Sequence, residues 1–285
     1  MVWFGPAGNA ESFETMGYKK TEQIPQYLEQ MGLSAYEYQC GRGVRVRQDV
    51  AEKLKGLFAE KKIRVSLHAP YYISLSSVEE EKRNNSVEYI LQSARAVDWM
   101  GGDRIVVHSG SCAKMTREQA TALAKETLAK AVRALDENGL SHIHICPETM
   151  GKINQLGTLE EVLELCTVDE RLIPCIDFGH LNARTLGGLM TPEAMRRVFE
   201  EMENRLGAER ARSFHSHFSK IQYTTGGEKC HLTFADTQYG PDFEPVAQLV
   251  VEKGCSAVFI CESAGTQAED AAAMRDIYHK IKETV

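Results

Sequence analysis

Hydrophobic positions along the chain follow two patterns that alternate from end to end. Short runs rich in β-branched and aromatic residues are typical of buried strands, and the longer amphipathic stretches between them are typical of helices. The strands are predicted at residues 2–5, 35–39, 63–68, 104–108, 142–146, 173–177, 213–218 and 257–262. The helices are predicted near residues 21–31, 48–61, 79–100, 116–138, 158–166, 191–206, 243–253 and 266–283.

Eight strand–helix repeats in a chain of 285 residues predict an α/β fold, a (β/α)8 TIM barrel of parallel strands. Suitable caps support several helix starts, because Glu118 closely follows Thr116 and Pro192 follows Thr191. A doubly wound open sheet is the alternative fold. The number of repeats and the absence of a GxGxxG motif after the first strand weigh against it. Since no linker or low-complexity segment divides the chain, we expect one domain over residues 1–285.

Composition narrows the classes of function. A hydrophobic content of 43% suffices for a large core, and a net charge of −7 argues against nonspecific nucleic-acid binding through a broad basic face. A local basic rim around a metal centre remains compatible with that charge, because bound cations would offset acidic ligands. The eight cysteines form no CxxC pair, which predicts free thiols in a reducing cytosol. We expect neither a secretory signal nor a membrane span, and therefore a cytoplasmic protein.

Six consecutive predicted strands, the third to the eighth, end in or lead into an imidazole or a carboxylate. In a TIM barrel the C-terminal ends of the strands meet at one rim, which carries the active site. So many acids and imidazoles at one rim would repel one another and lose hydration unless cations were bound. Mixed imidazole and carboxylate ligands suit Zn²⁺, with Mn²⁺ or Co²⁺ as alternatives. The candidate ligands are His68, His108, Glu148, Asp177, His180, His215, His231 and Glu262.

Three further histidines receive other roles. His217 shares a strand face with His215, and we expect it to hydrogen-bond a ligand rather than to bind a metal itself. His142 and His144 precede Glu148 on the fifth predicted strand, so we expect them to fill the barrel or its lower layers.

The motifs around these residues resemble a known family. The segments "SLHAPYY", "VVHSGS", "CPETMGK", "CIDFGH", the stretch from His215 to His231, and "FICES" follow in order the ligand motifs of endonuclease IV. That family comprises zinc-dependent apurinic/apyrimidinic endonucleases, TIM barrels with a trinuclear zinc centre. The resemblance implies that His68 and His108 hold one zinc, which Glu148 bridges to a second held by Asp177, His215 and Glu262, and that His180 and His231 hold a third.

The resemblance also implies an activity, the hydrolysis of the phosphodiester 5′ to an abasic site in duplex DNA during base-excision repair. A zinc-bound hydroxide would attack phosphorus while Glu148 positions the paired metals, and damaged duplex DNA would be the partner. Tyr71 lies at a position that in the family enters the damaged duplex, although it could instead pack against Tyr72. Arg42 and Arg45 could meet phosphates or could be solvated arginines. Neither a membrane nor a protein partner is implied.

One position departs from the family in a way that affects the metal count. Lys229 stands where the family has an aspartate ligand, and a protonated lysine has no lone pair to offer. Glu228 could take its place, Asp236 could reach back, or water could fill the position. Lys229 could also replace the charge of the third cation, so that either two or three zinc ions are compatible with the sequence.

Two other functions compete with the nuclease. Sugar isomerases and epimerases of the same superfamily hold one Mn²⁺, Mg²⁺ or Co²⁺ with two glutamates, an aspartate and a histidine, and use the glutamates as acid and base. Glu148, Asp177, His215 and Glu262 fit that set, with a small sugar as substrate. This alternative leaves several histidines, among them His68, without a role, which favours the nuclease. A barrel that only binds metal would show tight binding and no turnover.

Overall fold

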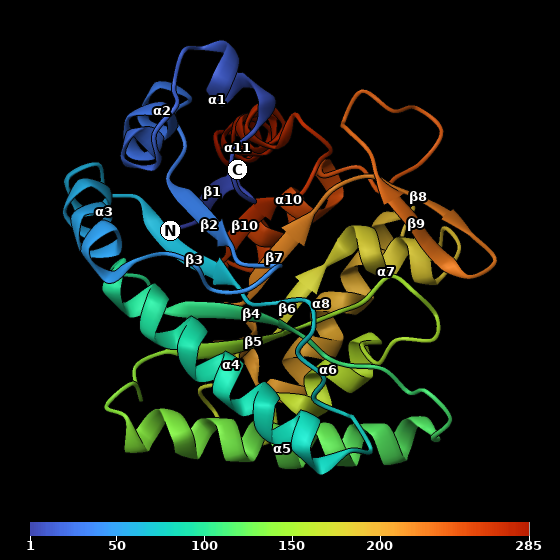
Figure 1. Cartoon of the computed structure of the whole chain (residues 1–285). Helices are drawn as coiled ribbons and strands as arrows, with labels where there is room; N and C mark the ends of the chain where they lie inside the picture. Colours follow the sequence, from blue (N-terminus) through green and yellow to red (C-terminus); the bar gives the residue numbers. More distant parts are fainter. Residues whose placement is uncertain (285) are drawn as a thin grey trace.

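The computed structural model describes residues 1–284 and forms a barrel of strands surrounded by helices (Figure 1). Within this range, eight parallel strands form one sheet in the order β1-β10-β7-β6-β5-β4-β3-β2. They are β1 (Trp3–Pro6), β2 (Ala35–Gln39), β3 (Arg64–His68), β4 (Arg104–His108), β5 (His144–Glu148), β6 (Cys175–Asp177), β7 (His215–Phe218) and β10 (Val258–Cys261). The prediction of a TIM barrel is confirmed.

The two edge strands, β1 and β2, approach each other and nearly close the barrel. Ser34 donates its backbone N–H to the Phe4 carbonyl over 3.0 Å, and an isolated parallel bridge joins Ala7 to Glu37. A Cβ atom at Gly5 would lie 1.8 Å from the Ala35 carbonyl oxygen. Only glycine therefore allows the strands to come this close.

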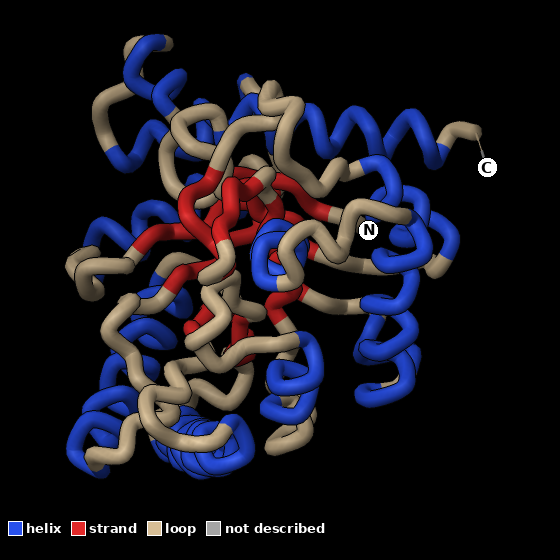
Figure 2. Tube along the Cα trace, turned by 90° about the vertical axis from the view of Figure 1, so that its right-hand side faces the viewer, coloured by secondary structure: helices blue, strands red, loops and turns tan. Residues whose placement is uncertain are grey.

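Helices cover the outside of the sheet, as a view turned by 90° shows with the red strands at the centre (Figure 2). They are α1 (Glu11–Thr15), α2 (Ile24–Gln30), α3 (Gln48–Glu60), α4 (Glu80–Trp99), α5 (Arg117–Glu137), α6 (Leu159–Leu165), α7 (Phe178–Arg184), α8 (Pro192–Leu206), α9 (Ala208–Ala211), α10 (Glu244–Glu252) and α11 (Gln267–Lys282). A 3-10 turn, Thr21–Gln23, precedes α2. In the part of the chain that is described, every helix is too short or too polar to cross a membrane.

The predicted elements agree closely with the observed ones, and the helix caps follow the expected chemistry. The Thr116 hydroxyl accepts a hydrogen bond from the Gln119 N–H, and the Thr191 hydroxyl accepts one from the Ala194 N–H. Sequence patterns did not predict the short helices α1, α7 and α9. They also did not predict the hairpin of β8 (Ile221–Thr224) and β9 (Gly227–His231) that follows β7.

The fifth strand starts and ends later than predicted, and this changes the surroundings of its histidines. His142 precedes β5 and lies on the surface, where its Nε2 is 2.8 Å from a carboxylate oxygen of Asp98. The prediction that His142 fills the barrel is therefore wrong. His144 begins β5 and is half-buried, and its Nδ1 donates to the Arg171 carbonyl over 2.9 Å. The same shift makes Glu148 the last residue of the strand.

The loop after β5 is held in place by partly buried polar contacts to its backbone groups. Arg117 and Arg184 both donate to the Gln155 carbonyl, over 3.0 and 2.8 Å. Glu161, in the first turn of α6, pairs with Arg117 and accepts the backbone N–H groups of Gly157 and Thr158 over 2.7 and 2.9 Å. This carboxylate therefore joins the loop, the helix start and one of the arginines.

Replacing Glu161 with glutamine should lower the free energy of unfolding by about 1–3 kcal/mol at pH 7, because charge-assisted hydrogen bonds are lost. Burial raises the pKa of Glu161, but the hydrogen bonds from Arg117 and the loop N–H groups outweigh it, so the pKa lies below the ordinary 4.5. Between the folded and unfolded pKa values the unfolded chain binds more protons, so this stabilisation falls as the pH drops from about 4.5 toward the lower pKa of the folded state. Urea unfolding of both metal-free proteins from pH 7 to pH 3 measures the difference, and a difference independent of pH would contradict the assignment.

Candidate metal centre

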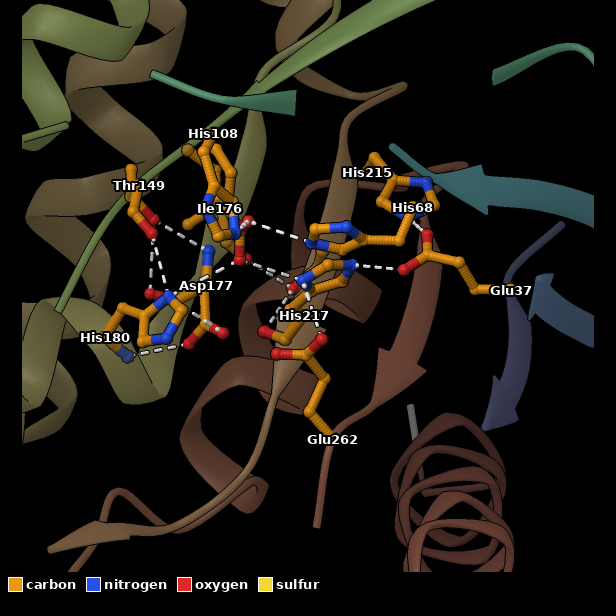
Figure 3. A network of polar contacts seen from close by, with 12 residues as sticks. Glu37, His68, His108, Thr149, Ile176, Asp177, His180, His215, His217 and Glu262 are labelled. Atoms are coloured by element: carbon orange, nitrogen blue, oxygen red, sulfur yellow. Dashed lines mark hydrogen bonds and ion pairs between the residues drawn. The ribbon is translucent and has the colours of Figure 1, made fainter. Parts of the chain in front are cut away.

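Donor side chains at the C-terminal ends of the strands meet in one buried cluster (Figure 3). The cluster contains three groups, and His217 also belongs to a fourth with Cys175 and His215; within each group the donor atoms lie within 4.8 Å of one another. The first group is His68, His108 and Glu148, the middle group is Glu148, Asp177, His217 and Glu262, and the third group is His180, Glu228 and His231. Because Glu148 belongs to two groups, the first and middle groups are continuous.

Glu148 lies at the centre of the cluster. Its Oε2 is 3.5 Å from the Nε2 atoms of both His68 and His108, and its Oε1 is 2.9 Å from His217 Nδ1. Burial opposes ionisation of this carboxyl, but the charge of His217 and hydrogen bonds from the neighbouring histidines hold the pKa of Glu148 well below its ordinary value. Glu148 is therefore a carboxylate that can bind a cation.

Two buried carboxylate oxygens support the assignment of metal sites. Within residues 1–284, Glu148 Oε2 and Asp177 Oδ2 are buried and have no hydrogen-bond partner. A buried oxygen without a partner is costly, and a divalent cation would satisfy both of them. The mixed carboxylate and imidazole donors fit Zn²⁺, and Mn²⁺ or Co²⁺ would also be compatible.

The histidine rings are oriented so that one nitrogen is engaged by the protein and the other faces the cluster. His68 Nδ1 lies 2.8 Å from the Ala69 carbonyl, and His180 Nδ1 lies 2.9 Å from the Thr149 carbonyl. His231 Nδ1 lies 2.8 Å from the Ser219 hydroxyl. In all three residues Nε2 is left for the cluster, and fixing a ring through its other nitrogen is usual for histidines that bind metals.

The protonation states of the histidines in the cluster are also compatible with metal binding, in which a cation would replace a proton. Burial lowers the pKa of His108 to about 3, so this ring is neutral at pH 7 and keeps a lone pair. Burial opposes charge on His180 as well, but Asp177 and Glu148 raise the pKa of His180 to about 10. Without cations, protonated imidazole thus balances part of the negative charge, and metal binding would release that proton.

The structure places His217, and not the predicted ligand His215, in the middle group, and groups His215 with Cys175 and His217 instead. The register of β7 against β6 pairs His217 with Asp177 and His215 with Cys175, one layer deeper in the barrel. His215 Nε2 is 3.0 Å from Glu37 Oε2, and burial lowers the pKa of His215 to about 4. His215 is therefore a neutral residue below the centre, and His217 takes the place predicted for it.

The hairpin that carries two residues of the third group contains a β-bulge at Lys229. On the hairpin, Gln222 pairs with Cys230 but Tyr223 pairs with Glu228, so Lys229 is the extra residue of a β-bulge. In a regular strand, residues 229 and 231 would share a face. The bulge instead places Glu228 on the face of His231, and it leaves Lys229 exposed to solvent.

Glu228 therefore supplies the carboxylate of the third group. Its Oε2 is 3.5 Å from His180 Nε2, and its Oε1 is 3.9 Å from His231 Nε2. The backbone N–H of Glu228 donates to the Gly151 carbonyl over 3.1 Å, and a Cβ atom at Gly151 would lie 2.6 Å from the Glu228 Cβ. Asp236, another alternative, accepts the N–H groups of Gln238 and Tyr239 within its own turn, through one of its carboxylate oxygens.

A pocket of about 220 Å³ opens above the cluster. Tyr71, which is 57% exposed, lies over it, with its ring centroid 5.2 Å from that of His68 and 5.3 Å from that of His108. Tyr71 also borders a second depression of about 350 Å³ that Arg42 and Arg45 line. Tyr71, Arg42 and Arg45 are thus brought together beside the donor cluster, whereas Tyr72 packs against Tyr89.

The fold and the donor cluster define the class of protein, a TIM barrel with potential metal sites at the C-terminal ends of its strands. The chain belongs to the xylose isomerase-like TIM barrel family, whose model matches residues 25–280.

Relatives in sequence agree with this assignment. The chain is 32% identical to the uncharacterized protein MJ0133 of Methanocaldococcus jannaschii over 281 residues, 99% of this chain and 98% of that protein. It is 30% identical to a probable endonuclease 4 of Methanosphaera stadtmanae over 158 residues, 54% of each chain. The chain therefore matches nearly all of the first relative and about half the length of the second.

Solved structures support the fold. A D-tagatose 3-epimerase-like protein matches with a TM-score of 0.75 and 19% identity, covering 99% of both chains. Endonuclease IV from Thermus thermophilus matches with a TM-score of 0.68 and 17% identity, covering 100% of this chain and 99% of that chain. The resemblance to endonuclease IV seen in the motifs thus recurs in the comparisons, and the same fold also occurs in sugar epimerases.

Proposed function

We propose that this protein is a metal-dependent phosphodiester hydrolase that incises duplex DNA 5′ to abasic sites, with a centre of three divalent ions, Zn²⁺ being the best fit. The observation that carries the proposal is the extent of the donor cluster. Three groups of donors lie together, and each contains imidazole and carboxylate. A single-metal enzyme would need only the middle group, and the other two would then be a costly concentration of buried polar side chains.

The residues of the centre would have distinct roles in this reaction. Divalent ions, when bound, supply Lewis acidity and activate water for attack on phosphorus. Glu148 joins the first and middle groups, so it would set the spacing of their two ions. Glu228, with His180 and His231, would hold the ion of the third group on the hairpin side of the pocket.

The side chains around the mouth of the barrel suit an anionic substrate that carries a planar or cyclic group. Among the described residues, Lys152 is the one lysine or arginine that lines the pocket, and Arg42 and Arg45 lie beyond Tyr71 on the other side. Cationic side chains on both sides of the donor cluster would contact phosphates along a backbone. The exposed Tyr71 ring offers a face for stacking at the lesion.

The second candidate is a divalent-metal-dependent sugar isomerase or epimerase. It is favoured by the middle group, in which Glu148, Asp177 and Glu262 surround His217 rather than the predicted His215. Burial raises the pKa of Glu262, whereas the pKa of Glu148 is lowered despite burial, and opposite shifts suit an acid–base pair. This reading gives the first and third groups no role, and for that reason we place it second.

Incision of a duplex oligonucleotide with one tetrahydrofuran abasic analogue tests the proposal. Zn²⁺-loaded protein should cut 5′ to the analogue, and the His68→Ala variant should be slower by on the order of 10²-fold or more, because it lacks a ligand of the first group. His142→Ala is the matched control, since His142 lies on the surface beside Asp98. A metal-loaded protein that leaves the duplex intact but epimerises a ketose would overturn the hydrolase and support the second candidate.

A further inference from the structure

A buried polar layer lies directly below the donor cluster, and Glu37 is its centre. Glu37 is fully buried in the middle of β2, where TIM barrels usually place branched apolar side chains. Its Oε2 accepts the Ser66 hydroxyl over 2.9 Å and faces His215 Nε2 at 3.0 Å. Its Oε1 lies 2.8 Å from His217 Nε2. Burying the ionised carboxylate of Glu37 is costly unless it is paired, so its presence here has to be explained by its contacts.

The contact with His217 supplies that reason. His217 is fully buried, and its two ring nitrogens face carboxylates on opposite sides (Figure 3). Nε2 faces Glu37, while Nδ1 faces Glu148 Oε1 at 2.9 Å and Glu262 Oε1 at 3.5 Å. A carboxylate can only accept, so in this structure each ring nitrogen donates a hydrogen to the carboxylate that it faces. A cation in the middle group would take the place of the hydrogen on Nδ1, while Nε2 keeps the hydrogen that it donates to Glu37.

We propose that Glu37 is a positioning residue of the metal centre, which fixes His217 as an Nδ1 ligand and increases the affinity of the middle group for its ion. Histidines that bind metals commonly donate their second N–H to a carboxylate, which makes the ring a stronger ligand. Ser66 and His215 satisfy the other oxygen of Glu37, so the carboxylate is held on both sides. The inference rests on the proposed function only in requiring a metal ion in the middle group. The alternative epimerase would also hold an ion there.

Metal affinity of the Glu37→Gln variant tests the inference. Glutamine keeps the size of the side chain but removes its charge, and loss of such a partner typically weakens metal binding by 10–100-fold. We expect one ion to bind that much more weakly in competition with a chelator, and the visible absorption of the Co²⁺-loaded protein to change. Glu164→Gln is the matched control, because it makes the same chemical change at a carboxylate that pairs with Lys125 and Arg205 on the outside of the barrel. That variant should keep the wild-type affinity and spectrum.

Glu37→Asp separates charge from packing. It retains the charge, so it should bind metal more tightly than Glu37→Gln does, and equal losses in the two variants would overturn the inference. Wild-type affinity and spectrum in Glu37→Gln would overturn it as well.

A measurement on the wild-type protein covers the case in which the Gln variant does not fold. With ¹⁵N-labelled histidine and bound Zn²⁺, His217 should be protonated at Nε2 and ligated at Nδ1, and a ring protonated at Nδ1 would overturn the inference. Failure to incise DNA, with these results intact, would count against the hydrolase alone.

Discussion

Replacing Glu148 with glutamine is expected to remove metal from the first and middle groups and to lower incision by on the order of 10³-fold or more, while the barrel stays folded. Glu148 is the residue that the first and middle groups share. A neutral amide lacks the charge that balances two cations, so both sites should weaken together. Each ion that is lost also removes electrostatic stabilisation of the developing phosphate charge.

Three measurements on the same sample test this prediction: bound metal per chain, the rate of incision and thermal unfolding. Glu164→Gln is the matched control, because Glu164 pairs with Lys125 and Arg205 on the outside of the barrel. That variant should keep its metal and its activity. If Glu148→Gln unfolds at ordinary temperature when metal-free, Glu148 is a structural residue and its assignment as a shared ligand fails.

The regular elements could be predicted from the sequence because their signals are local. Strands of a TIM barrel are buried on both faces and read as apolar runs, and the helices between them show one apolar face. Helix α7 was missed for an equally local reason. It is short, it follows β6 directly, and six of its seven residues are buried, so it shows no amphipathic pattern. Its N-cap is Asp177, which was interpreted only as a ligand.

The exchange of His215 for His217 shows what periodicity can determine. The alternation in "HSH" establishes that both rings share one face of the strand, and both do face the barrel interior. It does not establish how far along the barrel axis each ring lies, because that depends on the register of β7 against β6. Register is a property of two segments distant in the sequence, and the pattern of one of them does not contain it.

The glutamate at position 37 is unusual for a barrel strand, and this could have been used to predict its contact. A barrel strand should be apolar on both faces, yet "AYEYQ" carries a glutamate at its centre, at an inward position between Ala35 and Gln39. A carboxylate there must be paired with a partner on another strand. The second histidine of "HSH" was expected only to hydrogen-bond a ligand, and pairing its ring with Glu37 would have predicted the contact between Glu37 and His217.

From the sequence, Glu228 could be named only as one of several alternatives, because its role depends on a bulge. In a regular strand from Gly227 to His231, Lys229 would lie on the same face as His231. No residue of that segment indicates that the strand contains a bulge. The bulge is accompanied by contacts to a different loop, since Ile153 donates to the Gly226 carbonyl and Glu228 donates to the Gly151 carbonyl. These contacts between distant segments fix which side chain enters the site.

Replacing Glu228 with alanine is therefore expected to remove one metal ion per chain, and replacing Lys229 with alanine is expected to remove none. Glu228 is the carboxylate of the third group, and without it His180 and His231 would offer two neutral ligands, too few to hold a divalent ion firmly. Because the ion of the third group would be lost, incision by Glu228→Ala should fall by about 10²-fold. Lys229→Ala should keep all the ions and most of the activity.

The two variants change neighbouring residues of the same hairpin strand, so a general disturbance of the hairpin would affect both. Metal analysis after dialysis, together with the rate of incision, separates the possibilities. If Lys229→Ala gains an ion while Glu228→Ala loses none, the lysine charge has been standing in for the third cation, and the centre is binuclear. If Glu228→Ala alone loses an ion, the chain has kept a third site by moving its carboxylate one position along a bulged strand. The bulge would then be part of the metal centre as much as the ligands are.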